Sequence, residues 1–307
     1  MTLVTVLAAV SIVFPPEGAK LPALARCYVM GATDAGELNV ELRIANGELR
    51  VPVGRTGAWA TVVDVKPGTN VVEVGGVKRT FVVGSLEPVE SKEPKSGSKE
   101  LKRPYTKLEY AADQAKPHPA GKKPEEITVV LDAGHGGRDT GAMSPHGLSE
   151  SDANLRLAKS VRDELVNRGY KVVMTREDDR FVELYDRPKV AHKAKADLFV
   201  SIHHNAPGHA SNPFAIRSQS VYAWNPLGER LAKAVNARMA AADPSLRNDG
   251  VLHANFAVTR NPEIPSCLIE ADFITHPDGE SAVWDASRRP AIAAAIADGI
   301  ADWVAEK

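Results

Sequence analysis

The 307-residue chain lacks several features that would assign it to a class of protein at once. Its 38 basic and 39 acidic residues leave a net charge of −1, so there is no electrostatic reason to expect nucleic acid, which is usually bound by a basic face. The only two cysteines, Cys27 and Cys267, are far apart in the sequence and fall in different predicted domains. We therefore expect no disulfide between them, and the cysteines say little about the redox compartment.

A long hydrophobic run is also missing at the N-terminus. The apolar stretch Leu3–Phe14 has about 12 residues, which is too short to span a bilayer, so we predict no transmembrane segment. No Lys or Arg precedes this stretch, although a basic start is typical of a secretory signal peptide. We favour a first β-strand over Val10–Phe14 and leave open whether a signal sequence overlaps Met1–Ala9.

The composition changes twice along the chain. Residues 1–85 contain short apolar runs separated by turn signals such as Asn46-Gly47, and this spacing predicts an all-β sandwich. That region has no histidine, so we expect an accessory domain without catalytic chemistry. Pro, Lys, Glu and Ser dominate residues 86–124, which indicates a linker, because such a stretch buries too little apolar area to offset its ordering entropy. Within it, Tyr105–Ala112 is a candidate docking segment.

Residues 125–307 alternate between strand and helix patterns. A helix is predicted from Glu150, with Ser149 as its N-cap and Gly169 at its end. A last helix follows Ser287. The other predicted elements are strands over 127–131, 170–175, 198–202, 221–223 and 267–269, and helices over 184–194 and 226–241. This order favours an α/β domain, with a mostly parallel sheet flanked by helices on both faces.

Polar side chains of one chemical kind follow three of these strands. His135 comes after the first strand, His203 ends the third, and Glu270 ends the last, while Glu150 starts the first helix. The carboxyl ends of parallel strands meet at one edge of a sheet, so we expect these groups to converge. A lone strand-end histidine is more often structural. Two imidazoles and a carboxylate around one open position, however, match a catalytic zinc site, and a second carboxylate would serve as general base.

Residues 127–304 resemble the zinc-dependent N-acetylmuramoyl-L-alanine amidases of the Amidase_3 family. The segments that carry the resemblance are VVLDAGHGGRDTGA, Gly147-Leu148-Ser149-Glu150, VVMTREDDRFVEL, KADLFVSIHHNA and CLIEADFITHPDGE. Residues 10–84 resemble bacterial immunoglobulin-like (Ig-like) accessory domains through FPPEG, VMG, GAW and KPGTN. The first resemblance covers essentially the whole second domain, residues 125–307.

The resemblance to the amidases implies a zinc ion bound by His135, Glu150 and His203, with Glu270 as the catalytic carboxylate. It implies hydrolysis of the amide bond between the lactyl group of N-acetylmuramic acid and L-alanine in peptidoglycan. Because peptidoglycan lies outside the cytoplasmic membrane, we expect the protein in the periplasm or outside the cell. A zinc carboxypeptidase acting on wall peptides and a non-catalytic wall-binding protein are the alternatives.

Three further residues are candidates for supporting the site. Asp132 is a candidate to hydrogen-bond a metal-bound histidine, and Asn154 either braces Glu150 or caps the helix. Arg187 either orients a carboxylate or the substrate, or forms a structural ion pair. The chain departs from the family pattern beside the site at His204, Ala271-Asp272 and His276.

The segment after the third predicted ligand bears on regulation. Some family members carry a long insert there, with a helix that blocks the zinc until a partner protein removes it. Here only Ala206–Ser220 separates Asn205 from the next strand, which is too short for such a helix and its connections. We therefore expect an open site and no obligatory activator.

Overall fold

The structure is a computed structural model that describes residues 9–34, 36–85, 118–261 and 263–306. The candidate docking segment Tyr105–Ala112 and most of the predicted linker lie outside these residues. The chain divides into two compact units. Residues 1–110 and 208–213 form the first, and residues 111–207 and 214–307 form the second. Each unit is described by itself below, and the domain boundaries given above stay a prediction.

The first unit contains two β-sheets that share one hydrophobic core. The strands of the three-stranded sheet, in spatial order, are β1 (Val10–Phe14), β3 (Arg26–Thr33) and β6 (Ala58–Asp64). Those of the five-stranded sheet are β2 (Lys20–Leu21), β8 (Val77–Val83), β7 (Gly68–Val74), β4 (Asn39–Ile44) and β5 (Gly47–Pro52). Inward-facing residues of both sheets, among them Trp59 and Phe81, fill the core. The predicted first strand at Val10–Phe14 is confirmed as β1.

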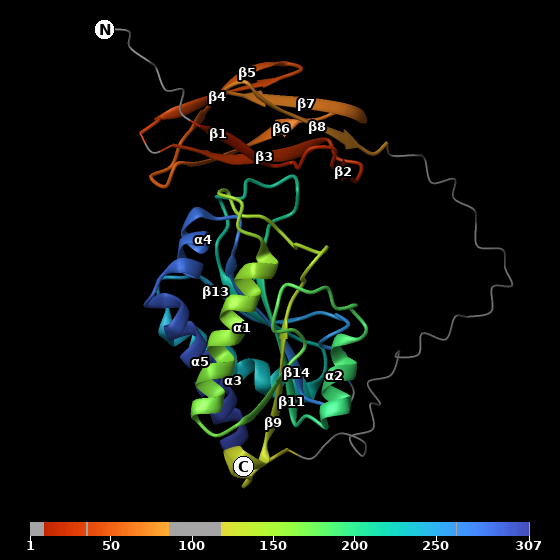
Figure 1. The fold of residues 1–307 in the computed structure, drawn as a ribbon, viewed down its shortest axis with the longest axis vertical. Helices are drawn as coiled ribbons and strands as arrows, with labels where there is room; N and C mark the ends of the chain where they lie inside the picture. The colour runs from red at the N-terminus through yellow and green to blue at the C-terminus, as the bar shows by residue number, and fades with distance from the viewer. Residues whose placement is uncertain (1–8, 35, 86–117, 262, 307) are drawn as a thin grey trace, which may run out of the picture. The chain divides into compact units, whose positions relative to one another are not determined.

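The second unit is built on one six-stranded mixed sheet (Figure 1). Its strands, in spatial order, are β10 (Lys171–Met174), β9 (Thr128–Ala133), β11 (Leu198–Asn205), β14 (Ser266–Phe273), β12 (Gln219–Ala223) and β13 (Asn248–His253). The first four are parallel to one another, whereas β12 is antiparallel to β14 and pairs in parallel with β13. Strand β13 was not predicted, because this edge strand is largely exposed and has no apolar run.

Helices cover both faces of this sheet, as predicted. On one face α1 (Glu150–Asn167), α3 (Pro226–Ala242) and α5 (Arg288–Ala305) share the main hydrophobic core with the strands. On the other face α2 (Arg187–Ala194) packs over β9 and β11. The remaining helical elements are the 3₁₀ turn η1 (Pro124–Glu126) and α4 (Pro277–Trp284), which contacts α5. Among the described helices, none combines the length and the apolar character needed to cross a membrane.

Strand β11 shows how the sheet separates the site from the core. Val200 and Ile202 point into the core that α1 and α5 cover, so the intervening residues point to the opposite face. His203 therefore projects on the α2 face and His204 on the core side, where it is buried. The same alternation in β14 puts Ile269 in the core and Glu270 on the face of His203.

Candidate metal centre

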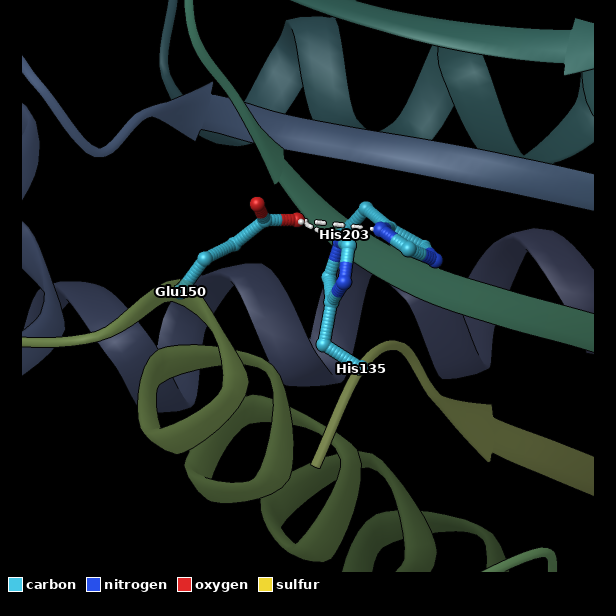
Figure 2. A group of neighbouring side chains, drawn as sticks. All are labelled: His135, Glu150 and His203. Atoms are coloured by element: carbon cyan, nitrogen blue, oxygen red, sulfur yellow. Dashed lines mark hydrogen bonds and ion pairs between the residues drawn. The ribbon is translucent and has the colours of Figure 1, made fainter. Parts of the chain in front are cut away.

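The structure brings His135, Glu150 and His203 together around one point, although they lie on three different elements (Figure 2). His135 Nε2 lies 3.2 Å from Glu150 Oε1, and His203 Nδ1 lies 3.0 Å from the same oxygen. One donor atom from each residue fits within a mutual distance of 4.8 Å. Tetrahedral zinc with bonds of about 2.0–2.1 Å sets its donor atoms about 3.3 Å apart, so the spacing suits such an ion.

Local sequence explains how each side chain reaches this point. His135 follows β9 with a φ of 61°, and the glycines after it, Gly136 and Gly137, have φ values of 127° and 59°. Glu150 is the first residue of α1, which begins there because Ser149 Oγ accepts a hydrogen bond from the backbone N–H of Asp152. His203 is held by the β11 ladder, so a loop, a helix start and a strand contribute one group each.

Two glycines make room for these side chains. A Cβ on Gly134 would lie 2.1 Å from His203 Nε2, well inside van der Waals contact. At Gly141 a Cβ would lie 2.5 Å from Glu150 Oε2 and 2.8 Å from His135 Cδ2. Glycine at positions 134 and 141 therefore lets the side chains of His203, His135 and Glu150 lie close against the backbone.

The site carries a negative potential that favours a cation. Burial opposes ionisation of Glu150, but the hydrogen bonds and charges of His135 and His203 outweigh it and hold the pKa of Glu150 well below its usual range. Burial also lowers the pKa of His135. The hydrogen bonds and charges of Glu150 and Asp139 outweigh that effect and raise the pKa to about 9. The carboxylates around His135 thus stabilise a positive charge at this position.

Glu270 lies beside the three donors in β14, where it is the Cα partner of His203 across the β11–β14 ladder. Its side chain is partly buried, its Oε2 atom is enclosed, and no described residue provides a hydrogen-bond partner for this atom. Burial, and secondarily the negative charge of Glu150, raise the pKa of Glu270 well above its ordinary value. A buried carboxyl oxygen without a partner is expected at a site that exchanges protons with a substrate or with water.

Comparison with known proteins identifies the second unit. Residues 129–302 match the family model described as N-acetylmuramoyl-L-alanine amidase, Amidase_3. The chain belongs to this amidase family. The reaction of this amidase is hydrolysis of the amide bond between N-acetylmuramic acid and L-alanine in peptidoglycan.

Individual relatives agree with the family assignment. The N-acetylmuramoyl-L-alanine amidase AmiA of Escherichia coli is 35% identical over 227 residues, which cover 59% of this chain and 77% of the relative. The probable cell wall amidase LytH of Staphylococcus aureus is 30% identical over 271 residues, which cover 87% and 84%. The solved structure of amidase AmiC2 of Nostoc punctiforme is 32% identical, has a TM-score of 0.55, and matches 59% of this chain and 98% of its own.

In this amidase, the partner of His135 is a residue that the sequence analysis missed. Asp139 Oδ2 accepts a hydrogen bond from His135 Nδ1 at 2.9 Å, the arrangement that commonly orients a metal-binding histidine. The expectation that Asp132 would fill this role is wrong. Asp132 instead accepts hydrogen bonds from Arg187, Thr175 and Ser201. The available signal was the position of Asp139, four residues after His135 in the same glycine-rich motif.

Two buried arginines hold the backbone that carries His135. Arg187 pairs with Asp132 at 2.9 Å and donates to the carbonyl oxygen of His135 at 2.9 Å, so of the two alternatives it forms the structural ion pair. Arg176, which the sequence analysis did not single out, is completely buried. Arg176 donates to the carbonyl oxygens of Ala133, Gly134, Ser151 and Asp178.

Asn154 connects the metal centre to the core side of the sheet. Its Nδ2 donates to Glu150 Oε1 at 3.3 Å and to the carbonyl oxygen of Gly134 at 3.2 Å, so it braces Glu150. Its Oδ1 accepts a hydrogen bond from His204 Nδ1 at 2.8 Å. Burial lowers the pKa of His204 to about 4, so the imidazole is neutral at pH 7. His204, at which the chain departs from the family pattern, is therefore a packed and hydrogen-bonded side chain on the core side of the sheet.

Proposed function

We propose that this amidase works with a zinc ion bound by His135 Nε2, Glu150 Oε1 and His203 Nδ1, with Glu270 as its catalytic base and acid. The observation that carries the proposal is the pairing of a three-donor cluster with a buried Glu270 oxygen that has no partner among the described residues. Two imidazoles and one carboxylate leave one tetrahedral position for water or substrate, as catalytic zinc sites do.

When bound, zinc supplies a Lewis acid that polarises the scissile carbonyl and acidifies a water molecule. Glu270 Oε2 accepts the proton of the attacking water, because no protein hydrogen bond competes for this atom. The same atom then donates the proton to the nitrogen of L-alanine as the amide bond breaks. The high proton affinity that burial confers on Glu270 suits this second step.

The test compares Glu270→Gln with His203→Ala on purified peptidoglycan. We expect Glu270→Gln to bind one zinc per chain and to lose activity by about 10²- to 10⁴-fold, the usual contribution of a general base. His203→Ala should lose both zinc and activity, and a chelator should inactivate the parent protein until zinc is restored. Ordinary turnover by zinc-loaded Glu270→Gln would rule out the proposed role of this residue.

We further propose that the protein acts in the periplasm or outside the cell, without an activating partner, and that the first unit is an Ig-like accessory domain. The proposal that no activating partner is needed is supported by residues 206–218, which connect β11 to β12 and contain no helix that could block the site. Purified protein with zinc should therefore release stem peptides from peptidoglycan at its full rate. A large stimulation by a second protein from the same cell envelope would contradict this part of the proposal.

A further inference from the structure

Between β13 and β14, residues 254–261 and 263–265 border the sheet face from which His203 and Glu270 project. In this segment Val258 and Ile264 pack against Ala191 of α2, Phe199 of β11 and Leu268 of β14. Side chains alternate along a strand, so His203, four positions after Phe199, and Glu270, two positions after Leu268, point to this same face. The segment therefore covers the part of this face that lies next to the metal centre.

The start of this segment packs on β12, which pairs with the strand that carries Glu270. The ring of Phe256 packs against the ring of Tyr222, with 5.3 Å between their centroids. Tyr222 lies two residues after Ser220, which is the Cα partner of Glu270 in the neighbouring strand. Burial, and next the charge of Glu270, raise the pKa of Tyr222, which places its phenol within the electrostatic reach of the catalytic carboxyl group.

Arg260, four residues further on, lies beside Tyr185 in the segment that precedes α2. Its guanidinium carbon is 5.9 Å from the ring centroid of Tyr185. Tyr185 comes two residues before Arg187, and Arg187 donates to the carbonyl oxygen of His135. The segment thus passes from Tyr222 of β12 to Tyr185 before α2, and Arg260 makes the second of these contacts.

The guanidinium of Arg260 lies over the Tyr185 ring, but the protein does not satisfy its hydrogen-bonding groups. Its Nε atom is buried without a hydrogen-bond partner, and no described residue forms an ion pair or a side-chain hydrogen bond with Arg260. Arg176 and Arg187, in contrast, are saturated by carbonyl and carboxylate oxygens. A buried donor without a partner destabilises a protein unless a ligand satisfies it. The planar guanidinium matches a carboxylate, to which it donates two parallel hydrogen bonds.

We propose that Arg260 is a specificity residue that binds a carboxylate on the peptide side of the scissile bond. This inference rests on the proposed function, which fixes where the substrate lies. On the glycan side the sugar is N-acetylated and uncharged, and the lactyl carboxyl group is already consumed in the scissile amide. The first free carboxylate is therefore the α-carboxylate of the D-glutamate that follows L-alanine and is joined onward through its γ-carboxyl group.

The test compares N-acetylmuramoyl-L-alanyl-D-glutamate with its α-amide, which differs only in the carboxylate. Binding is measured by calorimetry to zinc-loaded Glu270→Gln, so that no turnover is needed, and kcat and KM are measured with the parent protein. We expect the carboxylate substrate to bind at least about tenfold more tightly, because charge-assisted hydrogen bonds are the stronger class. Adding Arg260→Gln should abolish this preference through KM and leave the zinc content unchanged.

The matched control is Arg230→Gln, whose exposed guanidinium on α3 pairs with Glu306 and takes no part in the site. It should keep the full preference, and Arg260→Lys should keep part of it. An equal preference with and without Arg260, an equal loss for both substrates, or no preference in the parent would each overturn the inference. A clear binding preference without any turnover would count against the proposed function alone.

Discussion

Replacing Gly134 by alanine should strongly weaken zinc binding, although the substitution removes none of the three proposed donors. The added Cβ would lie 2.1 Å from His203 Nε2, 2.2 Å from Cε1 and 2.6 Å from Cδ2. Ordinary contact needs about 3.5 Å, so the overlap is about 1.4 Å. The ring cannot simply turn aside, because its Nδ1 atom is held 3.0 Å from Glu150 Oε1. Either His203 or the loop after β9 must move.

The size of this shift sets the expected effect. Metal–donor distances tolerate about 0.2 Å, so a displacement of about 1.4 Å removes His203 from the coordination sphere. Loss of a mere supporting contact already weakens metal affinity about 10- to 100-fold, so loss of a donor should exceed about 100-fold. Gly134 does not have a left-handed φ, so alanine adds no backbone strain and the effect is purely steric.

The assay is competition for zinc between the protein and a chromophoric chelator, with circular dichroism to verify folding. Gly208→Ala is the matched control, because its φ is ordinary and its Cβ would meet no atom within 4 Å. We expect the control to bind zinc like the parent. Folded Gly134→Ala with zinc affinity within about threefold of the parent would refute the reasoning, since the structure leaves no room for both groups.

Three further predictions concern the residues around the donors and the two thiols. Arg187→Met leaves the buried Asp132 unpaired and should lower the free energy of unfolding by about 3–5 kcal/mol in urea titrations; a loss well below this range would contradict the buried pair. Asn154→Ala should weaken zinc affinity about 10- to 100-fold, and an unchanged calorimetric affinity would show that the brace on Glu150 is dispensable. Burial raises the pKa of both thiols, that of Cys27 to about 12, so both stay protonated at pH 8. A thiolate reagent should therefore label Cys27 and Cys267 only after unfolding, and rapid labelling of the native protein would contradict this.

Most of the second unit's secondary structure is predictable because its signals are local. The β-branched run before His135, the capping serine before Glu150 and the apolar stripe of α1 each depend on neighbouring residues only. Strand β13 and helix α4 were not predicted, and β13 shows the limit of such signals. It is an exposed edge strand, so burial does not select an apolar pattern in its sequence.

The supporting residues could not be predicted, because their roles depend on which segments meet. Asp132 and Asp139 are both carboxylates near His135 in the sequence. Only the loop geometry decides that Asp139 accepts the hydrogen bond from His135 Nδ1. Arg176 comes directly after Thr175 at the end of a predicted strand, which says nothing of the carbonyl groups it binds. Arg260 is one arginine among many in the sequence, and only the folded chain shows that it lacks a partner.

The sequence by itself determined the order of strands and helices and the chemical types gathered at the strand ends, because hydrophobic periodicity and capping act over a few residues. The resemblance to the amidases then named His135, Glu150 and His203 as the group that the structure brings together. The tertiary structure alone decided which polar groups satisfy one another and which are left for a ligand. A buried hydrogen bond links residues tens of positions apart, and its partners are fixed only when the sheet and its covering helices have packed.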